Sequence, residues 1–175
     1  MKKLDISEKV VNRSYLSIGS NLGDKKLNIE KAKFLIISEG IYIVKCSSYY
    51  ETPSWPNPKH PKFLNVVLQI STNFKLFDLF KILKKIEKKI GRKKNPKNYP
   101  RVCDIDIVDF NKLYMTKTLG CNSVTVPHPR MYSRNFVLMP LFEIEPAWVD
   151  PKSNKEISEI ISNLSLNSIS AIKII

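Results

Sequence analysis

Asp104 and Asp106 are the two side chains of this chain whose types and spacing most directly suggest chemistry. They lie in an alternating pattern that predicts a β-strand over residues 102–110, and successive side chains of a strand point to opposite faces. Both carboxylates therefore share one face, whereas Cys103 and Ile105 point the other way. A divalent cation that prefers oxygen ligands, such as Mg²⁺, relieves the repulsion between neighbouring carboxylates. Taken alone, the pair is compatible with a metal site or with a solvated strand face.

Basic side chains stand on both sides of this predicted strand. Arg92 and Arg101 bracket the loop that leads into it, and His128 and Arg134 follow it. Carboxylates for a metal, together with Arg and His for phosphate oxygens, suit phosphoryl transfer, where catalysis depends on positioning and charge neutralisation. Structural alternatives stay open for two of these residues. His128 could cap a turn between its flanking prolines, and Arg92 could be the cation at a helix C-terminus.

Thr52, Pro53, Phe63 and Asn65 form a second group, with the chemistry to bind a flat heterocycle. A strand is predicted over residues 63–71, and on it Phe63 and Asn65 share a face. An aromatic ring offers a stacking surface, and an Asn amide offers two donors and an acceptor for the edge of a heterocycle. Ordinary packing is the alternative for this group.

The elements that must position these side chains follow one another as strand, helix, strand, strand, helix, strand. We expect strands over residues 14–18, 63–71 and 102–110 and one within residues 41–51. Helices are expected over residues 25–38 and 76–90, with a late helix over residues 155–164. This order is the βαββαβ arrangement of a ferredoxin-like α+β sandwich, here with a C-terminal extension. Residues 1–13 are polar and aperiodic, so we expect a loose N-terminal arm before a single domain over residues 14–175.

Composition narrows the classes of partner. The formal net charge of +13 suggests an anionic partner, such as nucleic acid, a membrane surface or a polyphosphate. Lysine supplies most of this charge, and the lysines of the second predicted helix form a solvated face. Apolar runs are too short to cross a bilayer, acidic and basic residues interrupt any secretory core near Met1, and the three cysteines show no zinc spacing. We expect a cytoplasmic monomer with no membrane partner.

Two other classes share single features with this chain. A nucleotidyltransferase of the polymerase-β type has a Gly-Ser turn and an aspartate pair close together, whereas here Gly19-Ser20 and Asp104 lie far apart. An RNA-binding module on a ferredoxin-like sheet has a Lys/Arg-Gly-Phe-Gly-Phe type strand with exposed aromatic side chains, which this sequence lacks. We therefore expect no nucleic-acid partner.

A series of motifs in order makes the chain resemble one known family. The motifs are Tyr15-Leu-Ser-Ile-Gly-Ser-Asn-Leu-Gly-Asp24, Ser47-Ser-Tyr-Tyr-Glu-Thr-Pro53, Phe63-Leu-Asn65, Pro100-Arg-Val-Cys-Asp-Ile-Asp-Ile107 and Val126-Pro-His128 to Arg134-Asn-Phe136. They resemble 6-hydroxymethyl-7,8-dihydropterin pyrophosphokinase (HPPK), an enzyme of folate biosynthesis. The resemblance covers residues 14–150. It implies an enzyme that transfers pyrophosphate from ATP to the hydroxymethyl dihydropterin and yields AMP and the pterin diphosphate.

The resemblance also implies a role for each matching residue. Two Mg²⁺ ions would be bound by Asp104 and Asp106, and these aspartates, Arg92 and Arg101 would be the catalytic residues, with Asp104 also beside the pterin. ATP, the co-substrate, would be contacted by Arg92, Lys94, Arg101, His128 and Arg134, with Ile107 and Thr125 beside the nucleoside. The pterin would lie between Phe63 and Phe136, with its edge read by Asn65 and by the backbone near Thr52 and Pro53.

This sequence departs from the family pattern at several positions. Ser54 replaces a second proline after Thr-Pro, and Pro129 stands where an aromatic residue can follow the histidine. In the basic loop, Lys94 stands for a phosphate-binding arginine and Tyr99 for the usual aromatic contact. Glu87 belongs to the pattern, and its role, ligand binding or bracing of the loop, stays open.

Overall fold

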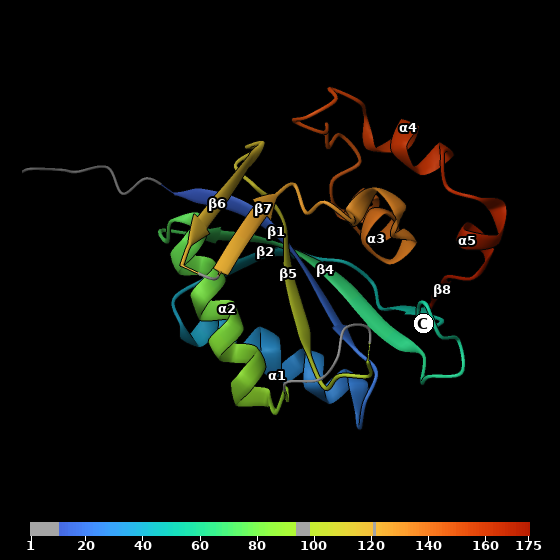
Figure 1. The fold of residues 1–175 in the computed structure, drawn as a ribbon, viewed down its shortest axis with the longest axis horizontal. Helices are drawn as coiled ribbons and strands as arrows, with labels where there is room; N and C mark the ends of the chain where they lie inside the picture. The colour runs from blue at the N-terminus through green and yellow to red at the C-terminus, as the bar shows by residue number, and fades with distance from the viewer. Residues whose placement is uncertain (1–10, 94–98, 121) are drawn as a thin grey trace, which may run out of the picture.

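The computed structural model describes residues 11–93, 99–120 and 122–175, and Figure 1 shows a twisted sheet with helices on both faces. The strands of the sheet are β1 (Asn12–Ser20), β2 (Tyr42–Cys46), β3 (Tyr50–Thr52), β4 (Phe63–Thr72), β5 (Asp104–Phe110) and β8 (Lys173–Ile174). A separate hairpin consists of β6 (Met115–Leu119) and β7 (Asn122–Val126). The helices are α1 (Lys25–Ser38), α2 (Leu76–Ile90), α3 (Asn135–Ile144), α4 (Ile157–Ser162) and α5 (Leu166–Ser170), and a 3₁₀ turn, Met131–Ser133, precedes α3.

The strand order is β5-β1-β4-β3-β8, and β2 pairs with β4 next to β3. All of these pairings are antiparallel. The strand expected within residues 41–51 is present as β2, and a second short strand, β3, follows it after a break. At the break, Ser47 bonds to β4 in both directions: its backbone N–H donates to the Val67 carbonyl, and its hydroxyl accepts from the Val67 N–H.

One face of the sheet is covered by α1 and α2, which form the larger core. Leu16 on β1, Val66 on β4 and Ile105 on β5 all belong to this core, because alternate side chains of a strand point to the same face. The expected bounds of both helices are confirmed. The second helix ends at Gly91, whose φ of 112° is a left-handed conformation that favours glycine at a helix C-terminus.

The opposite face is only partly covered. Tyr15, Val67 and Val108 pack there against α3 and the buried Trp148, whose indole N–H donates to the Asp109 carboxylate at 3.0 Å. Farther along the same face, α3 does not cover the sheet (Figure 1), and residues including Asp104 line a cleft. This uncovered part of the sheet is the floor of the candidate site.

The result is a mixed α/β fold around an antiparallel sheet, with several differences from expectation. β1 begins at Asn12, so Asn12 and Arg13 belong to the sheet and not to an N-terminal arm, and residues 1–10 lie outside the described part. The β6–β7 hairpin, α5 and β8 were not predicted. Within the described ranges, no helix has the length and apolar character needed to cross a membrane.

Candidate active site

A row of residues crosses the uncovered face in register. Gly19 on β1 stands between Asp104 on β5 and Asn65 on β4. A Cβ atom at Gly19 would lie 2.9 Å from Asn65 Oδ1, which is too close, so glycine makes room for the Asn65 amide. The sequence motifs include Gly19, but its role as the space beneath Asn65 becomes visible only in the sheet register.

Asp104 is held by two arginines. Arg92, just after α2, and Arg101, just before β5, contact different oxygens of the carboxylate, with Arg101 Nη1 at 2.7 Å from Oδ2. Arg92 is therefore more than a cation at the end of α2. Its backbone N–H donates to the Glu87 carbonyl at the helix C-terminus, and its side chain forms an ion pair with Asp104. Two guanidinium groups stand where an anionic phosphate can also be bound.

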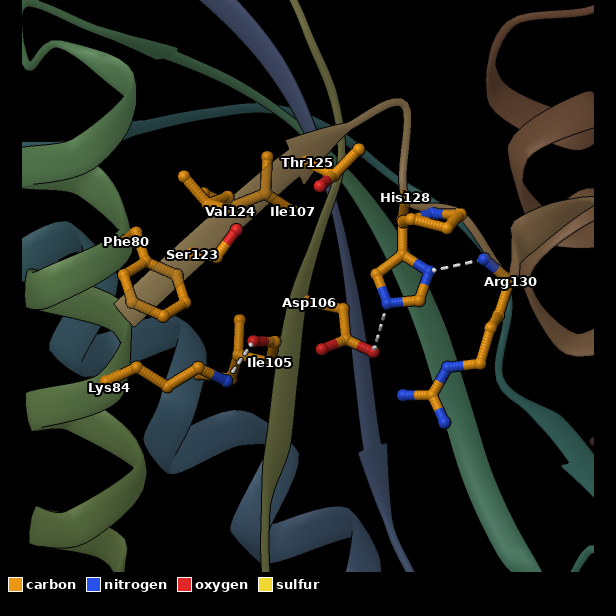
Figure 2. Close-up of a pocket in the computed structure, with 11 residues that line it drawn as sticks. Phe80, Lys84, Ile105, Asp106, Ile107, Ser123, Val124, Thr125, His128 and Arg130 are labelled. Carbon is orange, nitrogen blue, oxygen red and sulfur yellow. Dashed lines mark hydrogen bonds and ion pairs between the residues drawn. The ribbon is translucent and has the colours of Figure 1, made fainter. Parts of the chain in front are cut away.

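Asp106 has its own basic partners. Arg134 Nη1 lies 3.2 Å and His128 Nε2 3.6 Å from Asp106 Oδ2. Figure 2 shows the His128 ring between Asp106 and the backbone N–H of Arg130, which donates to Nδ1 at 3.2 Å. Since Nδ1 accepts, the proton of the neutral ring resides on Nε2 and faces the carboxylate. The ring is thus oriented as a donor toward the centre of the site.

Burial and neighbouring charges act in opposite directions on the pKa values of Asp106 and His128. Burial acts to raise the pKa of Asp106, but His128, Lys84 and Arg134 outweigh it and hold that pKa below its usual value. Burial also lowers the pKa of His128, and the attraction of Asp106 only partly compensates. Asp106 is therefore an anion at neutral pH, and His128 is a neutral hydrogen-bond donor.

Glu87 braces the site from α2. Its side chain is buried, and one oxygen, Oε1, accepts from Lys84 Nζ at 2.7 Å, Arg92 Nη1 at 2.5 Å and the Ile105 N–H at 2.7 Å. Burial raises the pKa of Glu87, although the two cations, Lys84 and Arg92, act to lower it. Since Ile105 lies between Asp104 and Asp106, Glu87 ties the helix to the strand at the aspartate pair, which answers the question that the sequence left open.

A cleft of about 1210 Å³ extends from the aspartates over the uncovered sheet. Thr52, Pro53, Phe63, Asn65 and Phe136 line it, as the sequence predicted for a heterocycle site. The Asn65 amide donates to Thr52 Oγ1 at 3.1 Å and to the Tyr50 carbonyl at 3.3 Å. These bonds use the donors, so Asn65 Oδ1 is the atom that can accept from a ligand.

A smaller cavity of about 290 Å³ lies on the other side of Asp106. Ile107, Thr125 and His128 line it as predicted, and Figure 2 shows that β7 and Phe80 of α2 form its walls. Thr125 is held by a 2.9 Å hydrogen bond to Thr116 across the unpredicted hairpin. Asp106 and Arg130 line both cavities, so the two meet at Asp106, with Asp104 on the side of the cleft.

All but one of the predicted site residues line these two cavities. Lys94 is the exception, because it lies outside the described residues. The sequence reasoning missed Lys84 and Arg130 as lining residues. For Arg130 there was a signal, since the chain has five arginines among its 29 basic residues and guanidinium groups are hard to replace where phosphate is bound.

The donor set fits magnesium ions that are shared with a substrate. Asp104 and Asp106 supply hard carboxylate oxygens at the junction of the two cavities. Among the described residues, no cluster of three His, Cys, Asp or Glu side chains could hold a metal by itself. Mg²⁺ commonly keeps several waters and binds through one or two carboxylates plus substrate phosphates, which matches a site with two aspartates.

Ser54 gives a prediction on stability. The residue is 3% exposed, and its hydroxyl has no hydrogen-bond partner among the described residues. Removing an unsatisfied buried hydroxyl should help the fold, so we expect Ser54→Ala to raise the unfolding free energy by about 1 kcal/mol. Ser14→Ala is the matched control, since the Ser14 hydroxyl donates to the Asp109 carbonyl and its loss should destabilise. Denaturant titration measures both, and a less stable Ser54→Ala would contradict the prediction.

Carboxylates surrounded by guanidinium groups, between two cavities on an open α/β sheet, define the class of a phosphoryl-transfer enzyme. Residues 15–146 match the family model of 7,8-dihydro-6-hydroxymethylpterin-pyrophosphokinase (HPPK). The chain belongs to this family.

Relatives and solved structures agree with the family match. The chain is 38% identical over 145 residues to 2-amino-4-hydroxy-6-hydroxymethyldihydropteridine pyrophosphokinase of Aquifex aeolicus, covering 83% of this chain and 88% of that protein. It is 39% identical over 140 residues to folic acid synthesis protein FOL1 of Dictyostelium discoideum, covering 80% of this chain but 20% of that protein. A crystal structure of Plasmodium falciparum HPPK-DHPS with pterin and p-hydroxybenzoate has the same fold, with a TM-score of 0.75 at 14% identity, covering 99% of this chain and 49% of that one.

Proposed function

We propose that this chain transfers the β,γ-pyrophosphoryl group of ATP to the hydroxymethyl group of 6-hydroxymethyl-7,8-dihydropterin in folate synthesis, at the junction of the two cavities. The observation that carries the proposal is this junction, where Asp106 and Arg130 line both cavities and cations surround the aspartate pair. ATP occupies the smaller cavity with its nucleoside near Ile107 and Thr125. The pterin occupies the cleft, with its hydroxymethyl group toward the aspartates.

The reaction forms one P–O bond and breaks another, and the proton of the hydroxymethyl group is released to solvent. The hydroxymethyl oxygen attacks the β-phosphorus, and the bond from that phosphorus to the oxygen bridging the α- and β-phosphates breaks, so AMP leaves. Arg92, Arg101 and Arg134 bind phosphate oxygens and stabilise the charge that spreads over them in the transition state. His128 donates a hydrogen bond from Nε2 to the same cluster of oxygens.

Asp104 and Asp106 are the residues that would hold Mg²⁺, for which we propose two ions. The bound metal neutralises charge on the phosphates and on the attacking oxygen. The carboxylates are ion-paired with arginines in the structure, so we propose that ATP draws these guanidinium groups onto its phosphates and leaves carboxylate oxygens for the metal. Glu87 is a positioning residue, since it contacts Arg92 and the Ile105 backbone.

The pterin ring lies between Phe63 and Phe136, with Asn65, Thr52 and Pro53 at its edge. Each aromatic ring is close to an arginine of the phosphate site: the Arg101 guanidinium carbon lies 5.9 Å from the Phe63 ring centroid, and that of Arg134 lies 5.4 Å from the Phe136 centroid. The same arginines thus link the stacking surfaces to the phosphate cluster, which supports a shared site for the two substrates.

The proposal also includes a ferredoxin-like core and a monomeric state. The order β5-β1-β4 with β2 and β3 beyond, and two helices on one face, supports a ferredoxin-like βαββαβ core. We also propose a monomer in the cytoplasm that binds pterin and ATP and no nucleic acid. Since the chain spans about a fifth of FOL1, the further activities of such longer proteins are not part of this proposal.

The product nucleotide tests the reaction. The protein is mixed with Mg-ATP and the hydroxymethyl dihydropterin, and the nucleotides are separated by chromatography. We expect AMP in equal amount to the pterin diphosphate. ADP would indicate ordinary phosphoryl transfer, and pterin-independent release of either nucleotide would contradict the proposal.

Asn65 and Phe63 give a prediction on ligand affinity. We expect Asn65→Ala and Phe63→Ala to weaken pterin binding by roughly 1–3 kcal/mol, because an edge or a face of the ring loses its partner, while ATP affinity changes little. Phe80→Ala is the matched control from the smaller cavity and should weaken ATP instead. Calorimetric titrations with each ligand check the partition. Equal losses of both affinities in one variant would contradict it.

A further inference from the structure

The C-terminal part of the chain contributes to the cleft, although the family match ends at residue 146. The lining residues from this part are Ser165, Asn167, Ser168 and Ala171, which we call the C-terminal wall. They lie in and around α5, which stands beyond α3 at the edge of the sheet (Figure 1). None of them was among the predicted site residues, so the wall is a feature that the family pattern does not assign.

Three contacts hold this wall in place. β8 follows it directly and pairs with β3, with Tyr50 opposite Ile174. The Ile175 N–H adds a bond of 3.0 Å to the Tyr49 carbonyl. On the other side, the Asn135 amide donates to the Ser168 carbonyl at 2.5 Å. Since Asn135 directly precedes Phe136, the wall is tied to the helix turn that presents a stacking ring of the pterin site.

The sheet order places β8, the strand that follows the wall, at the end of the sheet farthest from the aspartates. From the aspartates on β5, the order runs over β1 and β4, which carries Asn65, to β3, which carries Thr52, and then to β8. With about 4.8 Å between neighbouring strands, β8 lies roughly 19 Å from the strand of the aspartates. The wall is therefore attached at one end beside β3, which carries Thr52, and at the other end to Asn135, next to Phe136.

Two side chains of the wall suit a heterocycle edge. The Asn167 side chain is exposed and makes no hydrogen bond to the described residues, so its two donors and its acceptor are free to meet a ligand. Ser165 Oγ, in contrast, already accepts from the Ser168 N–H at 3.2 Å. Ala171 has a small side chain in the lining and leaves room at this end.

We propose that the C-terminal wall is a specificity determinant for the pterin, in which Asn167 hydrogen-bonds the amino-oxo edge of the ring and Ala171 sets the space for it. This inference rests on the proposed function. The amino-oxo edge of the pterin does not react, so contacts with it are made equally in the ground state and the transition state. They therefore act on pterin affinity and KM and leave kcat nearly unchanged.

The test compares substitutions in and next to α5 at residues that line the cleft with substitutions in α5 at residues that do not. We expect Asn167→Ala to weaken pterin binding about 5-fold, as for the loss of one hydrogen bond, and Ala171→Phe to weaken it about 10-fold or more, because the ring fills the end of the cleft. Leu166→Ala and Ser170→Phe are the matched controls, since neither residue lines the cleft, and they should change pterin affinity less than about 2-fold. The full chain is titrated with the hydroxymethyl dihydropterin in the presence of Mg²⁺ and α,β-methylene-ATP, whose α–β bridge cannot be broken.

The outcomes separate this inference from the proposed function. Wild-type affinity in both Asn167→Ala and Ala171→Phe, equal losses in their controls, or an equal loss of affinity for the ATP analogue would each overturn the role of the wall. Asn167 is exposed, so its variant stays informative even if Ala171→Phe folds poorly. A wild-type chain that neither binds the pterin nor forms AMP would instead overturn the proposed function on which the wall depends.

Discussion

Asp104→Asn and Asp106→Asn are each expected to reduce kcat on the order of 10³-fold or more, which corresponds to roughly 4 kcal/mol of transition-state stabilisation. Asparagine keeps the size of the side chain and an oxygen for the neighbouring arginines, but it removes the charge that binds a metal. We therefore expect a folded protein with an unchanged circular dichroism spectrum. Steady-state assays at saturating magnesium measure the loss.

Asp78→Asn is the matched control for these two variants. Asp78 lies in the first turn of α2, with an exposed side chain that forms an ion pair to Lys81 at 3.9 Å. Its replacement should leave kcat unchanged, since an exposed ion pair of this kind contributes little. Near-normal turnover of either active-site variant at saturating magnesium would rule out the metal role of the pair.

Arg92→Ala and Arg101→Ala are expected to lower kcat about 10²- to 10⁴-fold, with smaller changes in ATP affinity, because these cations act on charge that develops in the transition state. Arg13→Ala is the control, since Arg13 is an exposed arginine on β1 outside both cavities. Single-turnover assays separate the chemical step from binding. A loss confined to ATP affinity, with kcat retained, would contradict the assignment.

The two arginine variants should differ in stability. Arg92 is a partner of the buried Glu87 carboxylate, whereas Arg101 contacts the more exposed Asp104. We expect Arg92→Ala to lower the unfolding free energy by about 1–3 kcal/mol, since Lys84 is then the one cation left on Glu87 among the described residues, and Arg101→Ala to lower it less. Denaturant titration checks this difference. Equal stability of the two variants would argue against the bracing role of Glu87.

The amino-acid sequence by itself determined the features that follow local rules. The alternation of β5 predicts that Asp104 and Asp106 share a face, and the structure has both carboxylates in the cleft with Ile105 in the core. Helical spacing and a terminal glycine give the bounds of α2 correctly, because a helix is set by contacts between residues three and four apart and by its C-terminal cap. The family motifs contain residues that line both cavities, among them Asn65, Asp106 and His128.

Only the tertiary structure decided the features that depend on distant parts of the chain. Whether a sheet face is covered depends on where α3 and Trp148 pack, and this leaves Asp104 in an open cleft. The β6–β7 hairpin and β8 are short, and their pairing is stabilised by partners in space, so their sequences carry little signal of their own. The three bonds to one oxygen of Glu87 likewise join residues up to 18 positions apart, a distance over which no sequence periodicity applies.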